Sequence, residues 1–123
     1  MSHLTTNVRK VERDIARQKG PLNLFALFER EDLSDRWDLV VSAPWAKQDE
    51  ATLRYLTDII KRYLSPTQMT QLARVVVLDG TQDPVKTITE LYQVEHGQLE
   101  LSDLARFDLP AKHGYIITSR RAA

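Results

Sequence analysis

Residues 37–45, WDLVVSAPW, constrain the fold more than any other stretch of the chain, because every second residue in them is apolar. Successive side chains of a β-strand point to opposite faces, so this spacing gives a strand with one wholly apolar face. That face comprises Trp37, Leu39, Val41, Ala43 and Trp45. We predict that residues 37–45 form the central strand of a sheet, with a core on the tryptophan side.

A second strand is expected directly before this one. Residues 22–30, LNLFALFER, are apolar on both alternating faces, which is typical of a buried strand. The polar segment EDLSD that follows suits a short turn, so residues 22–45 are predicted to form an antiparallel hairpin. A turn centred between the third and fourth residues of that segment sets Glu29 opposite Asp38. Such a like-charge pair costs energy unless something intervenes.

Helical periodicity marks two longer helices. Residues 4–19 and 50–64 each place apolar side chains at spacings of three and four, and Asp49 is positioned to cap the second helix. Ser65-Pro66 combines a capping residue with a proline at the first helical position, which predicts a further short helix.

A parallel crossover is expected after these helices. Residues 74–78, RVVVL, form a β-branched run that predicts a strand covered on both faces. The order strand, helix, strand then predicts that residues 37–45 and 74–78 are parallel neighbours in the sheet.

The remaining elements are shorter. Asp83-Pro84 predicts a capped helix over residues 84–92. Residues 94–101 are expected to form a small hairpin that turns at His96-Gly97, and residues 114–119 a last strand.

The expected fold is one compact domain of the α/β class, with α+β as the alternative. It contains a mixed sheet of four to five strands and three to four helices. The sequence leaves the strand order after Tyr92 open, and residues 1–4 and 120–123 are expected to be mobile ends.

Charge and composition restrict the classes of partner. The chain has 17 basic and 17 acidic residues, a balance that disfavours nucleic acid or an anionic membrane as the main partner. The basic helix over residues 5–19 is the one candidate surface for phosphate or an acidic partner, and a solvated helix face is the alternative. Near-zero net charge favours self-association into a homo-oligomer.

Cysteine content and hydropathy indicate the compartment. The chain has no cysteine, so it forms no disulfide. It also lacks the apolar stretch of a signal peptide and any run long enough to span a membrane. We therefore expect a cytoplasmic protein.

An acidic cluster surrounds the predicted hairpin turn. Glu29, Asp35 and Asp38 offer the carboxylate oxygens that Mg²⁺ prefers, and Glu29 and Asp38 would be the catalytic pair of a metal-dependent phosphotransfer or nuclease-like enzyme. The alternative is a polar hairpin tip without a metal, balanced by Arg30 and Arg36.

Two further candidate sites involve single residues. Asp79 directly follows a predicted strand, where ligands gather in open sheets, so a sensor pocket is possible there; a plain turn explains the same residue. His96 and His113 would approach each other if the last two strands pair, giving an acid/base pair; turn and edge positions are the alternative.

The aromatic side chains provide the leading functional hypothesis. Trp37, Trp45, Tyr55 and Tyr63 are expected to gather where the strand over 37–45 meets the helix over 50–64, either as a partner surface or as core. With no catalytic motif and no cofactor signature, the sequence favours a non-catalytic protein-interaction or regulatory binding module. The Mg²⁺-dependent enzyme is the alternative.

Overall fold

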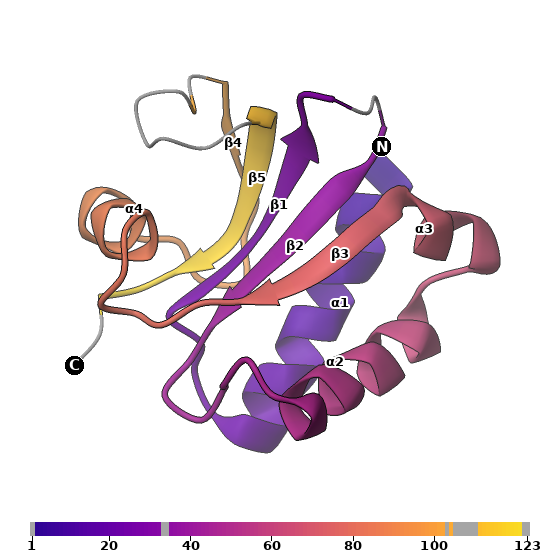
Figure 1. Cartoon of the computed structure of the whole chain (residues 1–123), viewed down its shortest axis with the longest axis horizontal. Coiled ribbons are helices and arrows are strands. Elements are labelled where there is room, and N and C mark those ends of the chain that lie inside the picture. The colour runs from indigo at the N-terminus through magenta and orange to yellow at the C-terminus, as the bar shows by residue number, and fades with distance from the viewer. Residues whose placement is uncertain (1, 33–34, 103, 105–110, 122–123) are drawn as a thin grey trace.

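In the residues that the computed structural model describes, 2–32, 35–102, 104 and 111–121, a mixed sheet carries helices on both of its faces (Figure 1). The elements follow in the order α1 (Ser2–Lys19), β1 (Leu24–Arg30), β2 (Trp37–Ser42), α2 (Glu50–Tyr63), α3 (Pro66–Gln71), β3 (Leu72–Val77), α4 (Val85–Leu91), β4 (Leu99–Leu101) and β5 (Ala111–Ser119). The strand order across the sheet is β3-β2-β1-β5-β4. β2 and β3 are parallel and the other pairs are antiparallel, so the predicted mixed sheet is confirmed and the domain is of the α+β kind.

The alternating stretch forms an interior strand, as predicted. β2 lies between β1 and β3, although β1 and not β2 occupies the middle of the sheet. The strand ends at Ser42, two residues before Pro44, which has no N–H to donate to a neighbour. Four of the five apolar residues on the predicted face belong to the same core, and Trp45 packs at its border.

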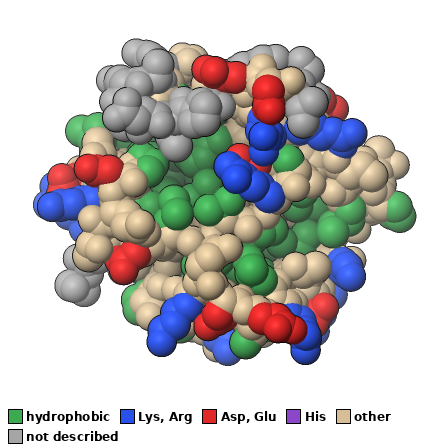
Figure 2. All heavy atoms as spheres, in the orientation of Figure 1, with side chains coloured by type: hydrophobic (Ala, Val, Ile, Leu, Met, Phe, Trp, Pro, Cys, Tyr) green, Lys and Arg blue, Asp and Glu red, His purple; other side chains and the backbone are tan. Residues whose placement is uncertain are grey.

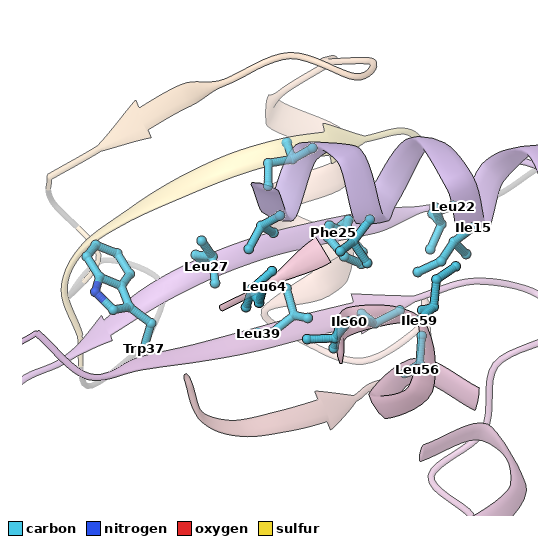
Figure 3. Packing of buried hydrophobic residues seen from close by; sticks show 14 of the residues in the cluster. Ile15, Leu22, Phe25, Leu27, Trp37, Leu39, Leu56, Ile59, Ile60 and Leu64 are labelled. Atoms are coloured by element: carbon cyan, nitrogen blue, oxygen red, sulfur yellow. The ribbon is translucent and has the colours of Figure 1, made fainter. Parts of the chain in front are cut away.

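Two cores lie on the two faces of the sheet. Figure 1 shows α1 and α2 against one face and α4 against the other. Figure 3 shows part of the larger core, beneath α1 and α2. That core comprises Leu4, Val8, Val11, Ile15, Leu22, Phe25, Leu27, Trp37, Leu39, Val41, Ala43, Leu56, Ile59, Ile60, Leu64, Val77 and Ile117. The smaller core comprises Leu24, Ala26, Phe28, Val40, Val85, Ile88, Leu101, Leu104, Ala111 and Ile116. β1 and β2 are therefore buried on both faces.

Local capping signals determine where two of the helices begin. The Asp49 side chain accepts a hydrogen bond from the Thr52 N–H at 2.8 Å, and Ser65 and Gln68 form a reciprocal capping box at α3. Both caps were predicted. The predicted Asp83 cap is wrong, because Pro84 occupies the cap position of α4 without any side-chain hydrogen bond.

The register of the hairpin differs by one residue from the predicted register. Glu29 is opposite Trp37, and Phe28 is opposite Asp38. A shift of one residue moves a side chain to the other face of the sheet, so Glu29 and Asp38 lie on opposite faces. The observed register pairs Leu27 with Leu39 in the larger core, and burial of these apolar pairs outweighs the turn geometry that was assumed.

The outer strands also differ from the predictions. β3 is an edge strand, so it is only partly buried and not covered on both faces. Residues 94–101 do not form a hairpin of their own, because Val94 pairs with Ser119 and β4 pairs with β5. β5 begins at Ala111, before the predicted start at residue 114, and α1 begins at Ser2. Among the described residues, the helices are too short or too polar to cross a membrane.

Candidate functional site

A pocket of about 580 Å³ opens beside α1, next to the C-terminal part of β5 and the segment containing His96. Its volume falls in the range of small-molecule sites. The basic side chains that line it are Lys10, Arg13, Arg17 and Arg120. The first three project from α1, so this pocket contains much of the basic helix face that the sequence singled out.

Glu12 is the buried acidic residue of the pocket, with 0% of its surface exposed. It follows Val8 by four residues and precedes Ile15 by three, so it lies beside the apolar stripe that packs α1 against the sheet. A fully buried carboxylate requires hydrogen-bonding or charged partners, because burial removes its hydration.

Two side chains from distant segments supply those partners. Oε1 of Glu12 lies 2.6 Å from Nδ1 of His96, and the Thr118 hydroxyl donates to Oε2 at 2.9 Å. The His96 N–H in turn donates to the Thr118 hydroxyl oxygen at 3.1 Å. The network is closed and joins α1, β5 and the segment that precedes β4.

The irregular backbone before β4 brings His96 to Glu12. Val94 and Leu99 both pair with β5, and between them the pairing is irregular, with the Gly97 N–H donating to the Ile117 carbonyl oxygen at 2.9 Å. His96 itself has a φ of 52°, a left-handed conformation in which histidine is enriched among non-glycine residues. Arg9 of α1 donates to the His96 carbonyl oxygen at 3.2 Å and fixes the segment from the other side.

Tyr63 of α2 completes the lining of the pocket. Its hydroxyl donates to Oδ2 of Asp14 at 2.7 Å. This hydrogen bond, with a second one from Gln18, holds the pKa of Asp14 below its usual value, and it raises the pKa of Tyr63. The bond ties α2 to α1 at the side of the pocket.

The four predicted aromatic residues do not form one surface. Trp37 is fully buried, with ring centroids 5.2 Å from His113 and 5.6 Å from Tyr115. Figure 3 places Trp37 at the far end of the core from Leu56. Trp45 instead meets Tyr55 edge-on at 5.8 Å, close to α2. A buried tryptophan cannot contact a partner, so only Trp45, Tyr55 and Tyr63 remain as candidate contacts.

The acidic residues near the hairpin turn are also separated. Glu29 lies 3.3 Å from Nδ1 of His113, and its other oxygen accepts from the Asp35 N–H at 3.0 Å. Asp38, on the opposite face, pairs with Arg30 at 3.6 Å and with Arg74 at 3.2 Å. Within the described part of the chain, no group of three or more histidine or acidic residues is arranged to hold a metal ion.

Asp79 does line a pocket, of about 570 Å³, at the carboxyl ends of β2 and β3. Its carboxylate accepts from the N–H and the hydroxyl of Thr81, at 2.8 Å and 2.9 Å. These bonds lower the pKa of Asp79 and hold the turn. The charged lining residues of this second pocket are Lys47 and Asp79, which balance, whereas four basic and two acidic residues line the first pocket, so the second is less suitable for an anion.

The expectation that the two histidines approach each other is wrong. His96 contacts Thr118, and His113 packs against Trp37, so the two lie near different parts of β5. Thr118 and His113 are separated by about 17 Å along an extended strand.

Sequence reasoning missed Glu12 and Thr118. The spacing of Glu12 from Val8 and Ile15 is a signal that a helical projection reveals, since it places a charge beside the apolar stripe. Its pairing with His96, 84 residues away, has no comparable local signal.

The chain matches no protein-family model, no curated protein and no solved structure. We call the pocket lined by α1 and β5 the α1–β5 pocket.

Proposed function

We propose that this protein is a non-catalytic, regulatory binding module that takes an anionic ligand in the α1–β5 pocket. The observation that carries the proposal is the convergence of basic side chains on a pocket of ligand size in a chain with no net charge. Those side chains are Lys10, Arg13, Arg17 and Arg120.

The charges at the pocket are unevenly compensated. Arg17 lies 4.0 Å from Asp14, at the limit of an ion pair, while Lys10, Arg13 and Arg120 form no ion pair with a described carboxylate. The acidic lining residues are Glu12 and the exposed Glu95. The carboxylate of Glu12 is already hydrogen-bonded to His96 and Thr118. Positive potential in a concave site of this kind concentrates anions.

The Mg²⁺-dependent alternative receives less support. Its proposed catalytic residues, Glu29 and Asp38, lie on opposite faces of the sheet; Glu29 contacts His113, and Asp38 pairs with two arginines. The sequence also lacks the motifs of nucleophilic and zinc hydrolases.

The test is a titration of isotope-labelled protein with inorganic phosphate at about 0.15 M ionic strength, in which NMR monitors the backbone amide shifts. We expect saturable shifts at the backbone amides of His96, Arg13 and Arg120. The substitution Arg13→Glu changes the local charge by two units. At about 6 Å in a water-like dielectric, that change corresponds to ~1.4 kcal/mol before screening, so phosphate affinity should fall about three- to tenfold.

Lys61→Glu is the matched control for this experiment. Lys61 is exposed and lies two residues before Tyr63, so it points to the opposite side of α2 from the pocket. We expect its phosphate affinity to stay close to that of the unchanged protein. Equal losses in both variants, or no saturable shifts at phosphate concentrations up to about 20 mM, would contradict the proposal.

The proposal extends to a cytoplasmic location, and to a protein partner or a second copy of the chain as a further binding partner. Support for self-association comes from β3, an edge strand whose outer side has no neighbouring strand among the described residues, although the Gln48 side chain accepts from the Val77 N–H there. Figure 2 shows hydrophobic side chains reaching the surface over this part of the sheet, where Leu72 and Val75 are half-buried. Light scattering after size exclusion tests it: a strict monomer at tens of micromolar contradicts the self-association.

A further inference from the structure

The Glu12–His96–Thr118 network engages Nδ1 of His96 and leaves Nε2 outside the network. The Thr118 hydroxyl accepts from the backbone N–H of His96, so the hydroxyl proton of Thr118 is directed to Oε2 of Glu12. The second oxygen of Glu12 faces Nδ1 of His96 at 2.6 Å. An ionised carboxylate only accepts hydrogen bonds, so Nδ1 is the nitrogen that donates to Glu12.

With the proton on Nδ1, Nε2 of the neutral imidazole carries a lone pair and accepts hydrogen bonds. Nε2 lies 3.7 Å from Oε1 of Glu95, which is also an acceptor and is too far away for a hydrogen bond. His96 and Glu95 both line the α1–β5 pocket. Two residues that line the pocket therefore each offer a hydrogen-bond acceptor, Nε2 of His96 and the Glu95 carboxylate.

The basic side chains of the pocket instead need hydrogen-bond acceptors from a ligand. Lys10, Arg13 and Arg120 offer only donors, which suit the oxygens of a phosphate group. A ligand that satisfies both sides needs an anionic group and, close to it, an O–H or N–H donor.

We propose that the α1–β5 pocket selects phosphorylated small molecules that carry a hydroxyl or amine donor beside the phosphate, with Nε2 of His96 and the Glu95 carboxylate as the acceptors. This inference rests on the proposed anion-binding function and adds the class of ligand. Glu12 acts as a positioning residue, because it fixes the tautomer of His96 without contacting the ligand.

Two probe molecules that differ in their hydroxyl groups test whether a donor beside the phosphate improves binding. Glycerol 3-phosphate carries hydroxyl groups beside its phosphate, and n-propyl phosphate has the same chain length without them. Affinities are measured by NMR titration at pH 9, where histidine side chains are ordinarily neutral. Since one hydrogen bond contributes a modest net amount, glycerol 3-phosphate should bind about three- to tenfold more tightly than n-propyl phosphate.

Phosphoethanolamine distinguishes an amine donor from a hydroxyl donor. If it binds more tightly than glycerol 3-phosphate, the ligand class narrows to amino phosphates, which fit the charge of Glu95. If it binds less tightly, the class narrows to hydroxylated phosphates. Both outcomes support the inference as long as one of the two donor probes exceeds n-propyl phosphate.

The substitution His96→Asn tests the acceptor itself. An asparagine amide can donate to Glu12 from the position of Nδ1, tolerates the left-handed backbone and has no counterpart of Nε2. We expect this variant to lose the preference for glycerol 3-phosphate over n-propyl phosphate, and the ratio of the two affinities is the quantity that is compared with the unchanged protein. Glu95→Gln removes the charged acceptor at an exposed position, so it should lower the affinity for phosphoethanolamine relative to the affinity for n-propyl phosphate. This variant serves if the histidine variant does not fold.

Different results would overturn the donor requirement and the anion-binding function. Equal affinity for all three probes overturns the inference on the donor and leaves anion binding in place. Absence of binding by every probe and by inorganic phosphate overturns the proposed function as well.

Discussion

Removal of the His96 side chain should destabilise the fold far more than removal of an ordinary half-exposed histidine. In His96→Ala, the buried Glu12 keeps one hydrogen bond, from Thr118, and loses its 2.6 Å contact with the imidazole. Leaving a buried acceptor without its hydrogen-bond donor costs about 1–3 kcal/mol, and more when the acceptor is charged. Water can enter from the adjoining pocket and hydrate the carboxylate in part, so we expect a cost of about 2–3 kcal/mol.

This loss converts into a measurable shift in melting temperature. Unfolding entropy is about 2.1 cal/mol/K per residue, which gives about 0.26 kcal/mol/K for 123 residues. A loss of about 2–3 kcal/mol therefore lowers Tm by about 8–12 °C. Calorimetry and urea unfolding at pH 7 both measure it, and an unchanged urea m-value shows that the unfolded state is the same.

A double-mutant cycle separates the buried charge from lost packing. Glu12→Leu removes the charge and keeps an apolar side chain beside the stripe of α1, so His96→Ala in that background should cost less than about 1 kcal/mol. His96→Asn retains a donor for Glu12 and should stay close to the original stability. A cost of about 2–3 kcal/mol for His96→Ala in both backgrounds would refute the reasoning, because the penalty would then not come from the carboxylate.

Three other predictions follow from local contacts. Tyr63→Phe removes the main cause of the lowered pKa of Asp14, so the variant should be less stable at pH 7. A lowered carboxyl pKa stabilises the fold only at pH values above that pKa, so the difference in stability should disappear as the pH falls through the Asp14 pKa. Urea midpoints at pH 7 and about pH 2 measure this difference. Gly114→Ala would place a Cβ 2.5 Å from the Phe28 ring and 2.9 Å from a backbone oxygen, so thermal unfolding should show a loss of about 1–3 kcal/mol; full stability would refute this close approach. Asp49→Ala removes the cap of α2 and should cost about 1 kcal/mol in urea unfolding, whereas Asp49→Asn, which keeps the acceptor, should cost less.

Local patterns in the sequence were sufficient for the elements and for most of the core. The stripe Leu4, Val8, Val11 and Ile15 and the alternating residues of β2 are buried as predicted. The caps at Asp49 and Ser65 are also in place. These features depend on residues within one or two turns of each other, so periodicity and hydrogen-bonding chemistry are enough to specify them.

The errors concern relations between segments. The hairpin register was inferred from the turn, yet the packing of Leu27 against Leu39 determines it, and the resulting shift separates Glu29 from Asp38. Residues 94–101 appeared self-complementary as a hairpin, but β5 offers them a longer partner. In each case two pairings satisfy the local pattern, and only burial in the whole fold discriminates between them.

The sequence by itself determined that α1 has an apolar side and a basic side, because both follow from helical spacing. Only the tertiary structure decided which residues contact Glu12, which lies at the border of these two sides. Glu12 becomes the centre of a network because His96 and Thr118, 84 and 106 residues away, reach it from the far end of the chain. A carboxylate on one helix carries no information about which distant donor will satisfy it, and that choice is made when the sheet brings β5 beneath α1.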